Sequence, residues 1–159
     1  TCFSQALTTF IGQNLGAKEY DRTKKGALFG TICGIGIAEV IGIAVFFFSP
    51  YLIAAFGGDQ KAIEYGIAEA HTIALFYCLL AFSHCMAAIQ RGAGRSIVPM
   101  FVMMLVWCGV RVTYISIVIR IIPVINVIYW AYPLTWFISS VIFLILFLKT
   151  DWIHGLEKQ

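Results

Sequence analysis

The feature that most constrains this chain is a run of apolar residues long enough to cross a lipid bilayer, which occurs four times. An α-helix rises about 1.5 Å per residue, so it needs about 20 apolar residues to cross roughly 30 Å of hydrocarbon. Only 12% of the 159 residues are charged, against about 25% in a soluble domain. The sequence therefore predicts an all-α integral membrane protein, a polytopic helix bundle with transmembrane helices over residues 26–49, 67–90, 98–119 and 126–148.

The two ends of the chain are too short for a further crossing. Residues 1–15 predict the end of a helix, which Gly16 stops. The sequence opens without Met, without a basic segment and without a cleavage-site pattern, so we predict no signal peptide. Residues 150–159 predict a short polar tail. We therefore expect residues 1–159 to be a single membrane-domain fragment of a longer protein.

Basic residues are distributed unequally over the two ends of the predicted helices. One end carries only Lys61 and Arg120, and the other carries Lys18, Arg22, Lys24, Lys25, Arg91, Arg95, Lys149 and Lys158. By the positive-inside rule, loops 16–26 and 91–97 and the C-terminus are predicted to be cytoplasmic, in a multi-pass protein of the cell (plasma) membrane. The net charge of +3 lies in short loops rather than on one basic face, which argues against a nucleic-acid partner.

A stripe of small residues follows one face of the predicted helix 26–49. These residues recur every four positions, at Gly26, Gly30, Gly34, Ala38 and Gly42. Small residues at this spacing allow two helix backbones to approach closely, which is how helices associate where water supplies no hydrophobic drive. We predict that this face packs against a neighbouring helix.

No pattern in the sequence predicts a catalytic or metal site. Four of the five cysteines lie in predicted membrane helices, and none has a CxxC or His spacing suited to zinc, so we interpret them as packing residues. Ser83 and His84 are adjacent, so on a helix they point about 100° apart and cannot form a nucleophile–base pair. The Gly-x-Ser-x-Gly motif of serine hydrolases is also absent. An intramembrane hydrolase that uses Ser83 or Ser116 with His84 is therefore disfavoured.

Three ionisable side chains, Glu39, Arg111 and His84, lie deep in the predicted spans, whereas Glu69 and His71 lie near the outer interface. Charge in hydrocarbon costs about 3 kcal/mol on insertion scales, so each is a functional candidate. Glu39 and Arg111 lie at similar depths, about 20 Å from the cytoplasmic ends of their helices. They could form a structural ion pair, or Glu39 could accept a cation or a proton. His84, about 10 Å from the cytoplasmic face, could relay a proton or donate an interhelical hydrogen bond.

Three stretches of the chain carry motifs that become specific when taken together. In the first, Gly12, Gln13, Gly16 and Ala17 precede a basic turn, and in the second Arg91, Gly92 and Gly94 are followed by Pro99. The third joins residues 108–111, Cys-Gly-Val-Arg, to residues 132–136, Tyr-Pro-Leu-Thr-Trp. In this order and spacing they resemble the multidrug and toxic compound extrusion (MATE) family: its loop motif, its Arg-Gly-x-Gly turn and the last two helices of its bacterial members.

The resemblance implies a partial C-terminal lobe of a twelve-helix transporter, running from the end of helix eight to helix twelve, with the missing N-terminal lobe as its partner. It implies a secondary active exporter of cationic or amphipathic small molecules, which works by alternating access and is not an enzyme. Inward flow of Na⁺ or H⁺ would drive it without a further cofactor, and Glu39, Arg111 and His84 become candidates for transport or ion coupling. Sodium-coupled members with a cation site in this lobe carry a deep acidic residue in helix ten. Residues 73–90 contain no Asp or Glu, which argues against a sodium site of that kind.

Two alternatives stay open at this level. A flippase for lipid-linked oligosaccharide or peptidoglycan precursor, from the same superfamily, would favour more cationic residues facing its cavity, where only Arg111 is a candidate. A non-transporting membrane scaffold is also compatible with a fragment of this size.

Overall fold

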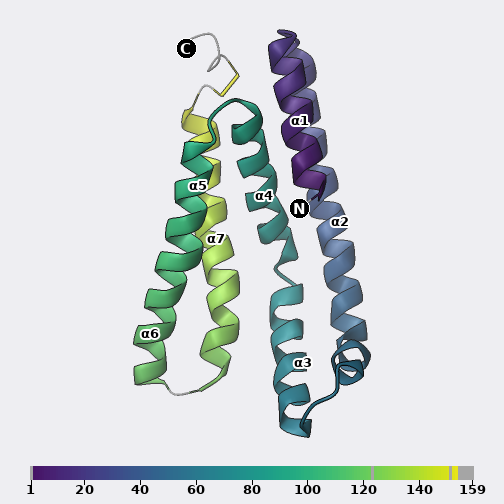
Figure 1. Cartoon of the computed structure of the whole chain (residues 1–159), viewed down its shortest axis with the longest axis vertical. Helices are drawn as coiled ribbons and strands as arrows, with labels where there is room; N and C mark the ends of the chain where they lie inside the picture. Colours follow the sequence, from purple (N-terminus) through teal and green to yellow (C-terminus); the bar gives the residue numbers. More distant parts are fainter. Residues whose placement is uncertain (1, 123, 151, 154–159) are drawn as a thin grey trace.

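The computed structural model describes residues 2–122, 124–150 and 152–153, which form helices joined by short turns (Figure 1). In chain order these helices are α1 (Cys2–Gly16), α2 (Tyr20–Ala55), α3 (Gln60–Ala74), α4 (Tyr77–Gly92), α5 (Ile97–Met103), α6 (Arg111–Ile121) and α7 (Asn126–Lys149). A π-helical segment, η1 (Met104–Val110), joins α5 to α6 without a break. The all-α fold class is as predicted, and the described part of the chain contains no strand.

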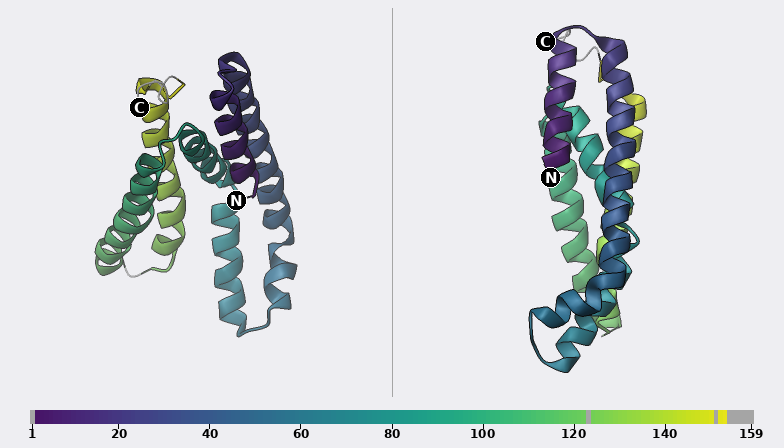
Figure 2. Two further views of the ribbon diagram at one scale, coloured as in Figure 1. Left: turned by 45° about the horizontal axis from the view of Figure 1, so that its top comes forward. Right: turned by 90° about the vertical axis from the view of Figure 1, so that its right-hand side faces the viewer.

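Helix α4 lies at the centre of the fold, where it packs against α1, α2 and α7. Helices α1 and α2 run side by side, and α3 and α4 return along α2 (Figure 1). The α5–η1–α6 rod and α7 then form a hairpin on the other side of α4 (Figure 2). The most buried side chains lie where α1, α4 and α7 meet, including Ile11, Ile89 and Phe143. Because α4 also contacts α5, its residues lie at the interfaces with four other helices.

Helix α2 is longer than the predicted span over residues 26–49. It begins at Tyr20, so part of the charged loop is helical, with Asp21 in the first turn, where a negative charge is favourable to the helix dipole. At its other end it passes through Pro50 and continues to Ala55. A proline inside a helix removes one backbone hydrogen bond and usually bends the helix. The predicted stop at Pro50 is therefore an internal position of one long helix.

The predicted single helix over residues 67–90 is interrupted in the structure. Helix α3 ends at Ala74, α4 starts at Tyr77, and the two axes differ in direction by 57°. At the break Phe76 has φ −111° and ψ 12°, and its backbone N–H donates to the carbonyl of Ile73 over 3.0 Å. Neither Gly nor Pro marks this position, so local sequence signals do not predict the bend.

Among the described residues, three helices are long and apolar enough to cross a membrane: Tyr20–Ala55, Ile97–Ile121 and Asn126–Lys149. The bent pair α3–α4 makes a fourth if it is counted as one span. For Ile97–Ile121 and Asn126–Lys149 the sequence predicts spans over residues 98–119 and 126–148. Of the predicted tail, residues 150–159, only 150, 152 and 153 are among the described residues.

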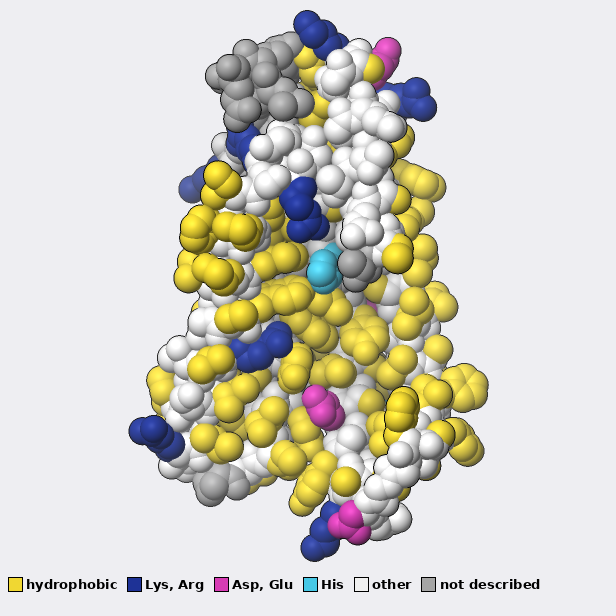
Figure 3. All heavy atoms as spheres, in the orientation of Figure 1, with side chains coloured by type: hydrophobic (Ala, Val, Ile, Leu, Met, Phe, Trp, Pro, Cys, Tyr) yellow, Lys and Arg dark blue, Asp and Glu magenta, His cyan; other side chains and the backbone are white. Residues whose placement is uncertain are grey.

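The surface has the character of a membrane protein. Hydrophobic side chains form a broad band over the face drawn in Figure 3, and Lys and Arg side chains are more numerous toward one end. Large apolar side chains are strongly exposed on α2, among them Phe29 and Phe47, as expected where lipid rather than water surrounds a helix. A few charged side chains also lie within the apolar band of this face (Figure 3).

The predicted small-residue stripe of α2 does pack against neighbouring helices. A methyl group added at Gly30 would lie 2.7 Å from the Leu7 side chain of α1, and one added at Gly34 would lie 2.7 Å from Cys85 Sγ of α4. At Gly42 it would lie 2.5 Å from the Ala74 carbonyl oxygen, at the α3–α4 break. Glycine at these positions allows α2 to approach three other helices, which confirms the packing interpretation.

Candidate functional site

The glycines of the first two motifs meet where α1 crosses α4. A methyl group added at Gly12 would lie 3.4 Å from the Gly92 carbonyl oxygen, and one added at Gly92 would lie 2.7 Å from the Thr8 carbonyl oxygen and from Ile11 Cβ. The Thr8 hydroxyl also donates to the Ala88 carbonyl over 3.2 Å. A side chain at Gly92 would collide with the backbone of α1, whereas one at Gly12 would make an ordinary contact. The two motifs therefore contact each other and set the angle between two helices.

The remaining motif residues shape the turns at the same end of the molecule. Gly16 is the last residue of α1, and the Ala17 N–H donates to the carbonyl of Gln13, whose side chain is exposed. Arg91 lies in the last turn of α4, Gly94 has a φ of +78°, and Pro99 is buried near the start of α5. These positions support turns and helix ends.

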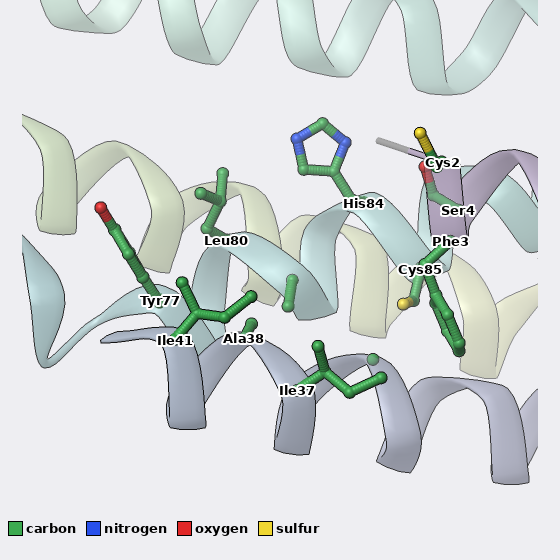
Figure 4. A pocket seen from close by; sticks show the side chains of 12 residues that line it. Cys2, Phe3, Ser4, Ile37, Ala38, Ile41, Tyr77, Leu80, His84 and Cys85 are labelled. Carbon is green, nitrogen blue, oxygen red and sulfur yellow. The ribbon is translucent and has the colours of Figure 1, made fainter. Parts of the chain in front are cut away.

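A cavity of about 450 Å³ lies between α1, α2 and α4 and is called here the central cavity (Figure 4). Its walls are mainly apolar, with the Tyr77 hydroxyl, the His84 imidazole and the Ser4 hydroxyl as polar groups. The lining residues are Cys2, Phe3 and Ser4 of α1, Gly34, Ile37, Ala38 and Ile41 of α2, and Tyr77, Leu80, Ala81, His84 and Cys85 of α4. An apolar cavity of this volume with few polar groups is typical of a small-molecule site.

His84 is the one predicted candidate that lines the central cavity. In Figure 4 its imidazole points away from Ile37 and Ala38 of α2. The ring packs edge-on against Trp107 of η1, with 5.3 Å between the ring centroids. The Trp107 Nε1–H is buried without an acceptor among the described residues. His84 therefore connects the cavity to the α5–η1–α6 rod through an aromatic contact.

Glu39 does not line the central cavity but contacts α4 next to it. The Cys78 thiol donates a hydrogen bond to the Glu39 carboxylate, in the first turn of α4 after the break. The other carboxylate oxygen, Oε2, is buried and has no hydrogen-bond partner among the described residues. A carboxylate in an apolar environment with an unused acceptor is costly unless a proton or a cation occupies it.

Arg111 makes its contacts on the other side of α4, with α7. Its guanidinium Nη2 donates to Thr135 Oγ1 over 2.8 Å and its carbon Cζ lies 4.3 Å from the centre of the Tyr132 ring. Its Nε is buried without an acceptor among the described residues. Tyr132 contacts Trp136, which contacts Tyr77, each pair with 6.1 Å between ring centroids. An aromatic row thus leads from Arg111 to the central cavity.

The structure keeps Glu39 and Arg111 apart. Helix α2, which carries Glu39, packs against α1, α3 and α4, whereas α6, which begins at Arg111, packs against α7 and η1. The two side chains have separate partners, Cys78 and Thr135, and within residues 2–122, 124–150 and 152–153 they form no ion pair with each other. The two residues lie at similar depths along their helices, but their side chains lie at two different helix interfaces.

A cluster of buried hydroxyl groups joins α4 to α7. Ser83 Oγ lies 2.9 Å from Ser139 Oγ and 3.0 Å from Ser140 Oγ, and Ser140 Oγ donates to the Leu79 carbonyl over 3.1 Å. Small polar residues of this kind hold membrane helices together. The Ser83 hydroxyl therefore points to α7, where its partners are the hydroxyls of Ser139 and Ser140.

Sequence reasoning gave no functional role to Tyr77, Cys78 or the serine cluster, whose contacts depend on the helix arrangement. Thr135 and Tyr132, by contrast, belong with Arg111 to the third motif, and the structure brings the two halves of that motif into contact. The available signal was the presence of polar residues inside apolar helices, which in membranes are usually paired with one another. Within the described residues no group of three or more His, Cys, Asp and Glu side chains could hold a metal ion.

Comparison with known proteins gives a family and one relative. Residues 1–125 match the family model described as MatE. The chain is also similar to the probable multidrug resistance protein NorM of Thermotoga maritima, with 29% identity over 99 residues. That alignment covers 62% of this chain and 21% of the relative. The chain thus spans only a part of the length of the curated relative that it matches.

Proposed function

This chain belongs to the MatE family, and from that premise we propose that the full-length protein containing it is a secondary active exporter. Its substrates would be cationic or amphipathic small molecules, moved outward by alternating access of two lobes. Inward flow of Na⁺ or H⁺ would drive the cycle, and neither catalytic residues nor a further cofactor would be required. The name of the Thermotoga maritima relative, a probable multidrug resistance protein, supports this substrate class.

The observation that carries the proposal is the Glu39 carboxylate. It lies in a membrane helix next to the central cavity, and its Oε2 is buried with no partner among the described residues. An ionised carboxylate in this position favours any cation or proton that can reach it. Binding of the coupling ion and its release at the other side of the membrane would then change the charge next to the cavity once per cycle. This is the minimal requirement for ion-coupled transport.

The central cavity supports the proposed substrate class. Its walls are apolar, and Tyr77 continues into the aromatic row formed by Trp136 and Tyr132. Aromatic faces attract organic cations, and the attraction increases when both partners are removed from water. An amphipathic cation could therefore place its apolar part in the cavity and its charge over an aromatic ring.

The chain is part of a multi-pass membrane protein. We infer that the α1–α2 turn, the α4–α5 turn and the C-terminus face the cytoplasm, since most basic residues gather there. A bacterial inner membrane is the proposed location.

Export of a cationic dye tests the proposal directly. Cells that express the full-length protein are loaded with the dye, and efflux is followed while the Na⁺ and H⁺ gradients are clamped separately. We expect efflux that stops when one of the two gradients is removed. Absence of export for every cation tested, together with accumulation of lipid-linked sugar in a deletion strain, would instead favour the flippase.

A further inference from the structure

A second cavity lies at the end of the molecule that carries most of the basic residues. It has a volume of about 460 Å³ and is formed by α2, α4 and α7 together with residues 152–153. We call it the α2–α7 groove, because α2 and α7 form its two walls and α4 its floor. None of its lining residues lines the central cavity, so the two are separate sites.

The interior of the α2–α7 groove is apolar. Its surface includes Ala27 of α2, Met86 of α4 and Phe147 of α7. The hydroxyl of Thr31, which also lines it, already donates to the Ala27 carbonyl over 2.8 Å. The Thr31 hydroxyl therefore does not require a hydrogen bond from an occupant, and an apolar occupant fits this interior better than a polar one.

The charged residue of the groove is Lys24, which is exposed at its end. Lys24 and Thr31 are seven positions apart on α2, so the groove extends about 10 Å along the helix axis between these two positions. Trp152, at the same end, stacks on Phe147 with 5.2 Å between ring centroids. A lysine and a tryptophan beside an apolar groove are typical of the boundary between hydrocarbon and lipid headgroups.

We propose that the α2–α7 groove binds a phospholipid with an anionic headgroup. One acyl chain lies along the apolar walls between α2 and α7, and the headgroup phosphate accepts hydrogen bonds from the Lys24 ammonium. Basic residues at the ends of grooves between membrane helices recognise anionic headgroups in this way. The charge of Lys24 favours a headgroup with a net negative charge, and the depth of the groove favours an acyl chain.

The test measures lipid retained by the purified full-length protein. Wild type, Lys24→Gln and Lys25→Gln are exchanged from lipid nanodiscs into detergent with dioleoylphosphatidylglycerol or dioleoylphosphatidylcholine, and bound lipid is counted by native mass spectrometry. Lys25 is the matched control, because it is exposed on the same helix but does not line the groove. We expect the wild type and Lys25→Gln to prefer phosphatidylglycerol, and Lys24→Gln to lose about fivefold in that preference, the effect of one lysine near a lipid surface.

A second variant tests the apolar part of the site. Ala27→Leu places a larger side chain in the groove and is expected to lower retention of both lipids while Lys24 remains. Equal retention by wild type and Lys24→Gln would overturn the proposal, as would equal binding of the two lipids by the wild type. Absence of any retained lipid, as expected if a further segment of the polypeptide covers the groove, would overturn it as well.

Discussion

The Arg111 guanidinium donates a 2.8 Å hydrogen bond to the Thr135 hydroxyl and fixes α6 to α7 within the apolar part of the molecule. Thr135 is fully buried, and its hydroxyl in turn reaches the carbonyl of Ala131 over 2.9 Å. The charged donor therefore depends on one hydroxyl acceptor and on the Tyr132 ring. Loss of that acceptor leaves a guanidinium with fewer partners in an environment that cannot solvate it.

We predict that Thr135→Val lowers the thermal stability of the purified full-length protein. Valine has nearly the shape of threonine but no hydroxyl, so the cost is that of a hydrogen bond to a charged group, about 1.5–3 kcal/mol. Thr135→Ser keeps the acceptor and should stay close to the wild type. Thermal denaturation in detergent measures the difference. A Thr135→Val protein as stable as Thr135→Ser would show that the hydrogen bond contributes little.

Two glycines of α2 should respond in opposite ways to substitution by alanine. At Gly42 the new methyl group would lie 2.5 Å from the Ala74 carbonyl oxygen, whereas at Gly36 nothing lies within 4 Å. Gly42→Ala must push α2 away from the α3–α4 break, and overpacking of this kind costs about 1–3 kcal/mol. Gly36→Ala should be neutral or stabilising by up to about 1 kcal/mol, since alanine is the better helix former. Thermal denaturation of the two purified variants measures the change in stability. Equal changes for Gly42→Ala and Gly36→Ala would contradict the close approach at Gly42.

The serine cluster predicts a smaller effect at the α4–α7 interface. Ser83→Ala removes a hydroxyl that contacts both Ser139 and Ser140. Hydrogen bonds between membrane helices contribute about 0.6 kcal/mol on average and up to about 1.7 kcal/mol. The melting temperature should fall accordingly, whereas Ser116→Ala, at an exposed position of α6, should leave it unchanged. If both variants had the melting temperature of the wild type, the hydrogen bonds of the serine cluster would contribute nothing measurable to stability.

The presence of membrane-spanning helices could be predicted from this sequence, because its apolar runs are long enough to cross a bilayer. The small-residue stripe from Gly30 to Gly42 was also predictable, since spacing alone places these residues on one face. The α3–α4 break was not, because Phe76 carries no local helix-breaking signal and the bend coincides with the close approach of Gly42.

The candidate site was predictable only in its charged members. Glu39, Arg111 and His84 are visible in sequence because charge in an apolar helix is rare. The similar depth of Glu39 and Arg111 suggested a contact between them. Depth, however, describes only the position along the membrane normal and not the direction in which a side chain points. The rotation of each helix decides which interface a side chain enters, and α4 separates the two. Cys78 and Thr135, the partners that the structure provides, come from these rotations.

The orientation of the protein can be measured by cysteine labelling. We predict that a membrane-impermeant maleimide added to intact cells labels a cysteine placed at Lys61, in the first turn of α3, and not one placed at Lys18, in the α1–α2 turn. The reason is the excess of basic residues at the Lys18 end, which the positive-inside rule assigns to the cytoplasm. Both variants are made in a background whose native cysteines are replaced by serine or alanine. Labelling at Lys18 but not at Lys61 would reverse the proposed orientation.

Glu39→Gln should abolish export while the protein remains in the membrane at its normal level. Glutamine has almost the same shape and can still accept the hydrogen bond from Cys78, so helix packing is kept, but it can neither take up a proton nor balance a cation. Dye efflux and a membrane immunoblot are measured together, with Glu64→Gln, at an exposed position of α3, as the control that should export normally. Because Oε2 of Glu39 has no hydrogen-bond partner among the described residues, the loss should come from the ion and not from the fold. Normal drug resistance in cells that express Glu39→Gln would remove Glu39 from the mechanism and move the coupling carboxylate to another part of the protein.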